Sequence, residues 1–404
     1  PDVVVEIAWD GSFRTPMSSW TWDDVSDYVE LDRGLGITWG RGDERATADA
    51  NTLTLVLDNS DGRFTAARST SPYYPDVVLY KPIRVTADPV DGSASVRFVG
   101  YITSWPVEWE DTDAYAKATI TASSRLARLG LNAAWRSLLE ETFLADDPVA
   151  YYPLGEPEAA TSAADVSGNG VQPLAMVGAG ADVVFGQATG PGTDDLTAAT
   201  FAAGKYLLRS RDNATVAGLS LECFFSSSST PTSGLERMIA SLGTLTLVQT
   251  ITGEVEARTL ETVTSPVSVT DGATHHLAAT YDQVTLRLYV DGVQVASTAS
   301  SFYAPIISNF IVGGDASLSS RLNGVVAHAA FYEHTLSAAS VLAHATAGAT
   351  AWAGETTDER MERYANLANI PDAELALDAG STTMLHIDTS GANVVDMMRL
   401  VETT

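Results

Sequence analysis

The sequence has only one cysteine in 404 residues, Cys223, so no disulfide bond can form within the chain. A lack of disulfides is typical of proteins that assemble in a reducing cytoplasm and is unusual for a secreted module of this size. Cys223 lies in the apolar run LSLECFF. We therefore predict a small buried core residue rather than a nucleophile, because buried thiols behave as apolar groups.

Long apolar runs are also missing. No stretch approaches eighteen apolar residues, so we predict no membrane-spanning segment. The first residues contain no basic region followed by an apolar core, and we expect no secretory signal.

Basic residues are scarce, with 23 Lys and Arg against 51 Asp and Glu and a formal net charge of −28. A protein that binds nucleic acid gains affinity by neutralising phosphates with Lys and Arg. We therefore exclude nucleic acid as a partner and interpret the charge as a source of solubility. Only 3 of the 23 basic residues are lysine, which indicates a genome rich in G and C, such as that of an actinobacterium or its virus.

Tryptophan is absent from the middle of the chain. Seven of the eight tryptophans lie between Trp9 and Trp135, and the eighth is Trp352. A break in composition at both edges of one segment is typical of an insertion, and the chain is long enough for two or three domains. We predict N-terminal β domains over 1–142, an inserted domain over 143–350 and a resumption of the first fold over 351–404.

Most of the chain has the pattern of β-strands. Runs such as TLTLVLD and YAKATITAS are rich in β-branched residues and alternate between apolar and polar. From Thr356 the period becomes helical, because Thr356 and Glu359 have capping-box spacing. Further on, one helical face is shared by Val394, Met397, Met398 and Val401. We expect a mainly β fold with short helices near its C-terminal end, and we expect the fold to continue beyond residue 404.

Residues 271 to 336 carry a recognisable order of strands and turns. Alternating runs flank Asp291-Gly292, a pair that favours a type I′ hairpin turn, and Gly313-Gly314-Asp315 and Asn323-Gly324 separate further runs. Together with DPVAYYPLGE and DVSGNG upstream, this order resembles the laminin-G-like, concanavalin-A-type jelly-roll family over roughly 143 to 348. The resemblance implies an antiparallel jelly-roll sandwich that binds carbohydrate or protein.

The flanking segments resemble a different family. LTLVLDNSDGRF, SPYYPDVVLYKPIRV and GYITSWPVEW before the insertion, and TTDERMERYANLANIP and GANVVDMMRLVE after it, are similar to actinobacteriophage minor tail proteins of the baseplate-hub type. This hub-type β fold, split by the jelly roll, would belong to a tail-tip subunit of the virion that assembles in the host cytoplasm. The resemblance implies a homotrimer that contacts the distal tail protein, the tape measure and other tail-tip proteins.

Two functions follow from these resemblances. In the first, the lectin-like domain decorates the tail tip and contacts a host cell-wall glycan or neighbouring tail proteins. In the second, the chain is a secreted bacterial carbohydrate-binding lectin or adhesin. Hub-like sequence on both sides of the jelly roll favours the first function.

The jelly-roll resemblance also implies candidate site residues. Related domains often hold a structural calcium ion through oxygen ligands, and Asp165 with Asp147 or Asp315 could supply them. The alternative for Asp165 is a turn closed by its side chain. Sugar sites usually stack an aromatic ring on the ligand, and the candidates here are Tyr206, Phe302 and Tyr303, each of which could instead be a core or edge residue. No other cofactor is expected.

We expect no enzymatic activity. Glucan-cleaving enzymes on this scaffold place two carboxylates at E-x-D-x-x-E spacing, and that string does not occur. Glu254 and Glu256 share one face of a strand, but we interpret them as its solvated side. For His275 and His276, which begin a strand, we predict packing or hydrogen bonding.

Overall fold

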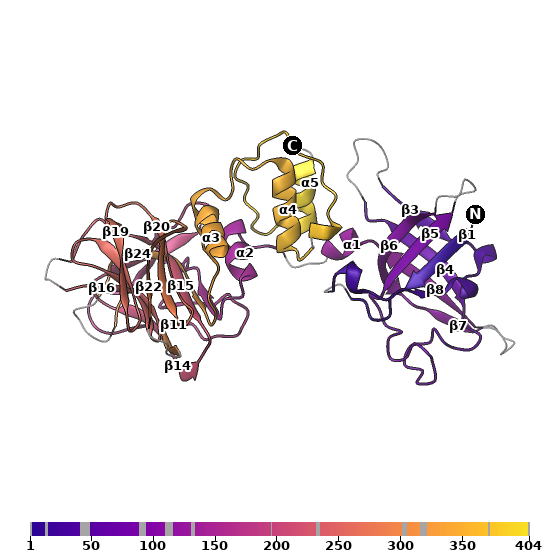
Figure 1. The fold of residues 1–404 in the computed structure, drawn as a ribbon, viewed down its shortest axis with the longest axis horizontal. Helices are drawn as coiled ribbons and strands as arrows, with labels where there is room; N and C mark the ends of the chain where they lie inside the picture. The colour runs from indigo at the N-terminus through magenta and orange to yellow at the C-terminus, as the bar shows by residue number, and fades with distance from the viewer. Residues whose placement is uncertain are drawn as a thin grey trace. The chain divides into compact units, whose positions relative to one another are not determined.

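The computed structural model describes residues 2–12, 15–40, 49–88, 94–109, 116–130, 134–194, 196–231, 235–300, 305–315, 321–370 and 372–402. The chain divides into two compact units (Figure 1). Unit 1 comprises Pro1–Ala134, Thr356–Met384 and Gly391–Thr404, and unit 2 comprises Trp135–Glu355 and Leu385–Ser390. The bounds of unit 2 differ from 143–350 because its first helix, α2 (Leu138–Ala145), packs against its last, α3 (Ala338–Thr350).

Unit 1 is built around one antiparallel sheet, sheet A, in the order β2-β1-β5-β6-β8-β4-β3, with β7 also paired to β8. Along β8, buried and half-buried residues alternate strictly, as expected for a sheet with a single face on a core. That core includes Leu55, Phe98 and Ile120. The strands are β1 (Asp2–Ile7), β2 (Asp23–Asp24), β3 (Gly36–Thr38), β4 (Thr52–Asp58), β5 (Pro82–Asp88), β6 (Ser95–Ser104), β7 (Val107–Trp109) and β8 (Ala116–Ser123).

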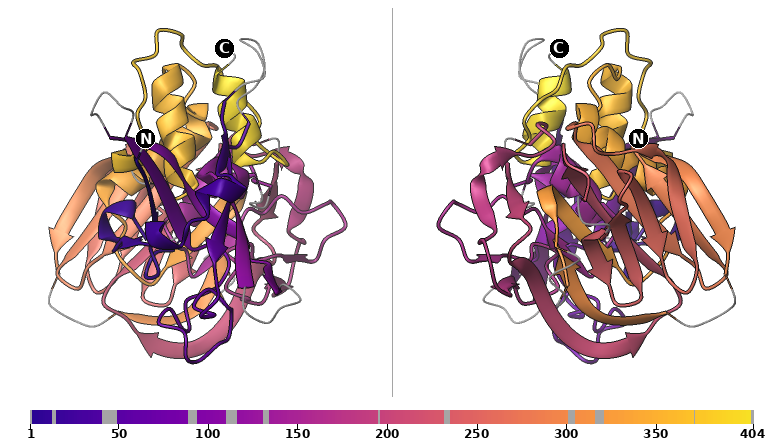
Figure 2. Two further views of the ribbon diagram at one scale, coloured as in Figure 1. Left: turned by 90° about the vertical axis from the view of Figure 1, so that its right-hand side faces the viewer. Right: turned by 90° about the vertical axis from the view of Figure 1, so that its left-hand side faces the viewer.

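The helices of unit 1 are short, and two of them pack side by side, α4 and α5 (Figure 2). Glu359 accepts a hydrogen bond from the backbone N–H of Thr356 at 2.8 Å, which accounts for the start of α4. In α5, Val394, Met397 and Val401 of the predicted apolar face are buried, and Met398 is half-buried. The helices are α1 (Arg125–Leu129), α4 (Thr357–Leu367) and α5 (Val394–Glu402), with 3₁₀ turns at Met17–Ser19, Ser26–Tyr28, Leu31–Arg33 and Asp372–Glu374.

Unit 2 is a sandwich of two antiparallel sheets (Figures 1 and 2). Sheet B has the order β12-β13-β24-β15-β20-β21-β22, with β9 paired to β24, and sheet C has the order β10-β11-β14-β23-β16-β17-β18-β19. The strands of sheet B are β9 (Ala150–Tyr152), β12 (Val184–Thr189), β13 (Thr197–Ala202), β15 (Leu219–Ser226), β20 (His275–Tyr281), β21 (Thr285–Val290), β22 (Val293–Ala299) and β24 (Asn323–Tyr332). The strands of sheet C are β10 (Ser162–Ala163), β11 (Leu174–Val177), β14 (Tyr206–Thr215), β16 (Arg237–Leu242), β17 (Leu245–Gln249), β18 (Glu254–Arg258), β19 (Thr262–Ser268) and β23 (Ile306–Val312).

Sheet B is covered on both faces. Its inner face meets sheet C in the main core, and Cys223 lies there fully buried, as predicted. Its outer face forms a second apolar cluster with α2 and α3, which includes Phe143, Phe224 and Val341. Seven of the eight residues of β15 are buried because this strand lies between the two clusters.

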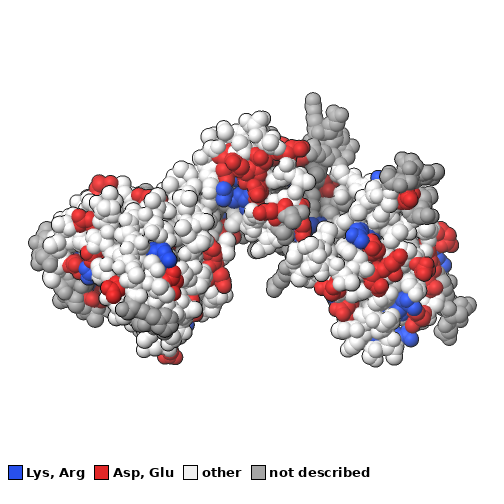
Figure 3. Space-filling model, viewed as in Figure 1, with Lys and Arg blue, Asp and Glu red and all other residues white. Residues whose placement is uncertain are grey.

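The predicted fold class is confirmed, since the chain is mainly β, with three antiparallel sheets and short helices near its C-terminal end. None of the described helices is long and apolar enough to cross a membrane. Acidic side chains are spread over the face shown in Figure 3, and basic ones are few.

Candidate functional site

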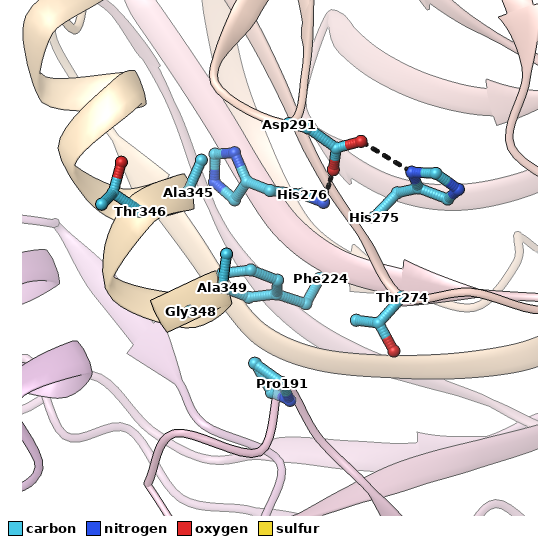
Figure 4. Close-up of a pocket in the computed structure, with 10 residues that line it drawn as sticks. All are labelled: Pro191, Phe224, Thr274, His275, His276, Asp291, Ala345, Thr346, Gly348 and Ala349. Atoms are coloured by element: carbon cyan, nitrogen blue, oxygen red, sulfur yellow. Dashed lines mark hydrogen bonds and ion pairs between the residues drawn. The ribbon is translucent and has the colours of Figure 1, made fainter. Parts of the chain in front are cut away.

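A cavity of about 440 Å³ opens on the outer face of sheet B beside α3 (Figure 4). One side of it is small and apolar, formed mainly by proline, alanine and glycine over the ring of Phe224. The other side is polar and comes from the start of β20 and the β21–β22 turn. The lining residues are Pro191, Phe224, Thr274, His275, His276, Asp291, Ala345, Thr346, Gly348 and Ala349.

The polar side is organised by the hairpin turn at Asp291-Gly292. Both residues have positive φ, 50° and 79°, which confirms the predicted type I′ turn. The turn brings the Asp291 carboxylate to His275, with 2.8 Å between Oδ2 and Nδ1, and its Oδ1 accepts the backbone N–H of His276 at 2.9 Å. The turn that closes the hairpin therefore also places one of the cavity's carboxylates.

His275 lies between two carboxylates. Its Nε2 is 3.2 Å from Asp271 Oδ1, opposite the contact between Nδ1 and Asp291. The hydrogen bond to Asp291, reinforced by the charges of both aspartates, outweighs partial burial and raises the pKa of His275 above its usual value. Burial alone would raise the pKa of Asp291, but hydrogen bonds from His275 and from the His276 N–H lower it. The cavity lining therefore includes one carboxylate, Asp291, beside an imidazole whose protonated form is stabilised by Asp291 and Asp271.

Beneath the cavity lies a buried charged network. Glu222 of β15 is fully buried. Its Oε2 lies 3.1 Å from His276 Nε2, and its Oε1 lies 2.8 Å from His344 Nδ1. The same Oε1 accepts a hydrogen bond from the Tyr332 hydroxyl at 2.6 Å. Burial alone would lower the pKa of His344, but Glu222 and Asp146 outweigh it and raise the pKa to about 9. The positive charge of His344, with hydrogen bonds from His276 and His344, likewise overcomes burial and lowers the pKa of Glu222 to about 2. The pair is therefore ionised at neutral pH.

The network joins the helices to the sheet. His344 of α3 approaches the Thr142 carbonyl of α2 at 3.1 Å, and the ring of Phe143 stacks on the His344 ring with centroids 4.4 Å apart. A second buried group includes His328, whose Nδ1 is 2.7 Å from the Tyr151 hydroxyl and whose Nε2 is 2.8 Å from Asp194 Oδ2. The three histidine side chains in these groups are almost fully buried, and of them only His276 lines the cavity.

The accessible chemistry of the cavity is hydrogen bonding. Carboxylate oxygens accept hydroxyl hydrogens, and a threonine hydroxyl both donates and accepts. The exposed Thr274 hydroxyl has no hydrogen-bond partner among the described residues. Such a polar side facing a small apolar side suits a ligand that has hydroxyl groups on one edge and C–H groups on the other.

The structure does not bring the three predicted calcium ligands together. Asp165 Oδ1 accepts the backbone N–H groups of Tyr151 at 2.9 Å and Ser167 at 3.2 Å, and Oδ2 accepts the Ser167 hydroxyl at 2.8 Å, as in the alternative turn interpretation. Asp147 is exposed, and Asp315 is half-buried. Among the described residues, there is no group of three or more His, Cys, Asp or Glu side chains that could hold a metal ion. Calcium binding stays a prediction.

Of the aromatic candidates, Tyr206 is described by the structure and does not line the cavity. Tyr206 is 8% exposed, and the guanidinium of Arg321 lies 4.3 Å from the centre of its ring, so little of the ring is open to a ligand. Phe302 and Tyr303 lie outside the described residues. In β18, Glu254 and Glu256 do share the outward face, where Glu256 pairs with Arg258.

Sequence reasoning missed the residues that line the cavity. His275 and His276 were noticed, but not their carboxylate partners Asp291 and Glu222. The contact between His275 and Asp291 could have been predicted from the sequence, because a type I′ turn at Asp291-Gly292 fixes which residues of β20 lie next to the turn. The contact with Glu222 had a weaker signal, a lone carboxylate inside the apolar run LSLECFF.

Comparisons with known proteins concern unit 2. Residues 210–342 match the family model described as the concanavalin A-like lectin/glucanases superfamily, laminin G type. No curated protein sequence matches the chain.

Solved structures resemble the chain only distantly. Domain 4 of AbnA, a GH43 extracellular arabinanase from Geobacillus stearothermophilus in complex with arabinotriose, is 15% identical, with 49% of this chain and 98% of that chain covered and a TM-score of 0.37. The receptor binding domain of botulinum neurotoxin D is 12% identical, with 53% and 55% covered and a TM-score of 0.40. The chain spans about half the length of the neurotoxin domains it matches. The family match and the sandwich of sheets B and C together show that residues 210–342 belong to a concanavalin A-like lectin/laminin G domain.

Proposed function

We propose that this chain is a structural subunit of a phage tail tip, of the baseplate-hub kind, whose concanavalin A-like domain binds a glycan of the host cell surface. The observation that carries the proposal is the discontinuity of unit 1, which combines residues from before and after the lectin-like domain. The main part of unit 2, Trp135–Glu355, is joined to unit 1 at both of its ends, and unit 2 also takes in the short segment Leu385–Ser390. That arrangement supports a scaffold that displays a binding domain.

In this proposal the scaffold assembles as a trimer at the tail tip, in contact with the distal tail protein and the tape measure, and assembly takes place in the host cytoplasm. Immunogold electron microscopy of virions with antibodies against the chain is the direct test. We expect label at the tail end and a trimer mass for the purified protein. A monomer that is absent from virions and is secreted by a bacterium would support the adhesin alternative instead.

The glycan site in this proposal is the cavity beside α3. The Asp291 carboxylate and the Thr274 hydroxyl suit sugar hydroxyls, and the apolar side of the cavity suits the C–H face of a sugar ring. Pull-down of the full chain on actinobacterial cell-wall fractions tests this. Ala349→Phe fills the cavity from an exposed position on α3 and should abolish binding, whereas Thr350→Phe adds the same ring at an exposed neighbour that does not line the cavity. Equal binding by both variants would exclude the cavity as the site.

We further propose that the domain binds without catalysis. Asp291, the carboxylate that lines the cavity, and Asp271 are both engaged with His275, rather than set apart as an acid and a nucleophile. Incubation of the chain with the same cell-wall fractions should release no soluble reducing sugar. A steady release that is lost in Asp291→Asn would show an enzyme.

A further inference from the structure

A second hollow lies on the outer face of the same sheet. It has a volume of about 380 Å³ and is lined mainly by small hydroxyl-bearing and amide side chains at the ends of β13, β15 and β24. The lining residues are Thr200, Phe201, Ser226, Ser227, Ser228, Ser229, Gly272, Asn323, Gly324 and Val325. Gly272 is two residues from Thr274, which lines the first cavity, so one short segment borders both hollows.

The strand register places residues of both hollows along one row across sheet B. Phe224, whose ring lines the first cavity, points outward, so Ser226 two residues later points outward as well. Ser226 pairs with Val325, and Val325 pairs with Thr200, which gives one outward row across three strands. On the other side of β15, Phe225 pairs with His275, so extending this register by one residue sets Thr274 beside Ser226. The row therefore runs from the second hollow into the first.

The hydroxyl groups along this row are available to a ligand. Among the described residues, the hydroxyls of Thr200, Ser226, Ser228 and Thr274 have no hydrogen-bond partner. A hydroxyl group both donates and accepts, as do the hydroxyls of a sugar. By contrast, Ser227 is already bound to the carbonyls of Ser229 and Asn323 and supports the wall of the hollow.

Charge limits the class of ligand. Residues 135–355 contain 22 Asp and Glu against 8 Lys and Arg. Asp291 lines the first cavity, Asp271 lies 3.2 Å from the neighbouring His275, and neither hollow has a lysine or arginine in its lining. A carboxylated or phosphorylated sugar would meet like charge there, whereas the hydroxyls of a neutral sugar would meet acceptors.

We propose that the two hollows are subsites of one extended site, which binds a neutral oligosaccharide of at least two to three sugars along the row from Thr200 to Thr274. This inference rests on the proposed function, because it assumes that the cavity beside α3 is a glycan site. The cavity holds one sugar ring against Pro191 and Ala349, and the hydroxyl row holds the sugars that follow. Neutral chains bind in preference to chains that carry uronic acid, sialic acid or phosphate.

The test is calorimetric titration of the full chain with size-fractionated neutral oligosaccharides cut from the cell-wall fraction, from one to four sugars, with gluco- and arabino-oligosaccharides as defined probes. We expect a trisaccharide to bind at least about tenfold more tightly than the monosaccharide. Thr200→Val and Ser226→Ala should each reduce trisaccharide affinity by on the order of threefold to tenfold, as expected for one hydrogen bond, and leave monosaccharide affinity unchanged. Thr262→Val, an exposed change of the same kind on sheet C, is the matched control.

The outcomes separate the two proposals. Equal affinity for one and three sugars, or no effect of Thr200→Val and Ser226→Ala, overturns the extended site and leaves the single-cavity proposal standing. Binding that is stronger for acidic oligosaccharides overturns the ligand class. If no oligosaccharide binds and the pull-down also fails, the proposed function itself falls, and the extended site with it.

Discussion

The buried pair of Glu222 and His344 gives a quantitative prediction for the stability of unit 2. Glu222→Gln keeps the size and shape of the side chain but removes the negative charge that faces His344 at 2.8 Å. The rise of the His344 pKa from 6.5 to about 9 corresponds to roughly 2–3 kcal/mol of folding free energy at pH 7. The lowered pKa of Glu222 expresses the same interaction and is not added to it. Breaking a buried ion pair typically costs about 3–5 kcal/mol, which agrees in size.

Differential scanning calorimetry of the full chain measures this loss. For a unit of this length, about 3 kcal/mol corresponds to a fall in Tm of roughly 6–12 °C in the transition of unit 2. Glu261→Gln makes the same chemical change at a half-buried position outside the network and should shift Tm by about 1 °C or less. A loss below about 1 kcal/mol in Glu222→Gln would refute an ionised buried pair.

The pH dependence of the stability of unit 2 tests the same ion pair and the direction of each pKa shift. Because the pKa of His344 is raised, its contribution is complete below about pH 6.5 and is lost as the pH rises toward 9. Because the pKa of Glu222 is lowered from 4.5 to about 2, its contribution is complete above about pH 4.5 and is lost as the pH falls toward 2. The stability of unit 2 should therefore decline on both sides of a plateau, and His344→Gln should remove the alkaline decline. An unchanged alkaline decline in that variant would assign it to another group.

Three further predictions concern other parts of the chain. Cys223 should remain unreactive toward a thiol reagent in the native protein and react only after unfolding, because burial raises the pKa of its thiol; rapid native labelling would contradict the buried position. Gly292→Ala should destabilise unit 2 by about 1–3 kcal/mol in urea unfolding, because φ is 79° and an added Cβ would lie 2.9 Å from Leu342 Cδ1; an unchanged midpoint would mean that the turn tolerates a side chain. Replacing residues 135–355 with a short Gly/Ser bridge should leave a cooperatively folding unit 1 by circular dichroism, and an unfolded remnant would contradict an insertion.

Local patterns predicted much of the fold. The turn at Asp291-Gly292 followed from two adjacent residues, and the start of α4 followed from Thr356 and Glu359, since backbone geometry and capping depend on near neighbours. The buried place of Cys223 followed from the apolar run around it. In each case the sequence signal and the physical cause lie within a few residues of one another.

The site was harder to predict because its residues meet over long distances in sequence. His276 lies 54 positions from Glu222, and His344 lies 122 from it, and no spacing rule joins three strands and a helix. The cover over Tyr206 was hidden for a related reason, since an isolated tyrosine gives no sign that an arginine such as Arg321 will lie against its ring. Which hydroxyls line one face of sheet B also depends on the register, which becomes known only when the strands are paired.

The contact between α2 and α3 has a consequence for how unit 1 can fold. These two helices begin and end the 221 residues from Trp135 to Glu355, and Thr142 and His344 hold them together side by side. Closing a loop of that length in an unstructured chain would cost roughly 3 kcal/mol more than closing a bridge of about ten residues. Once the lectin-like domain has folded, the distance between its ends is fixed by one helix packed on another, so unit 1 closes what is in effect a short loop. Folding of the inserted domain first would thus lower the entropic barrier to joining the two distant parts of unit 1.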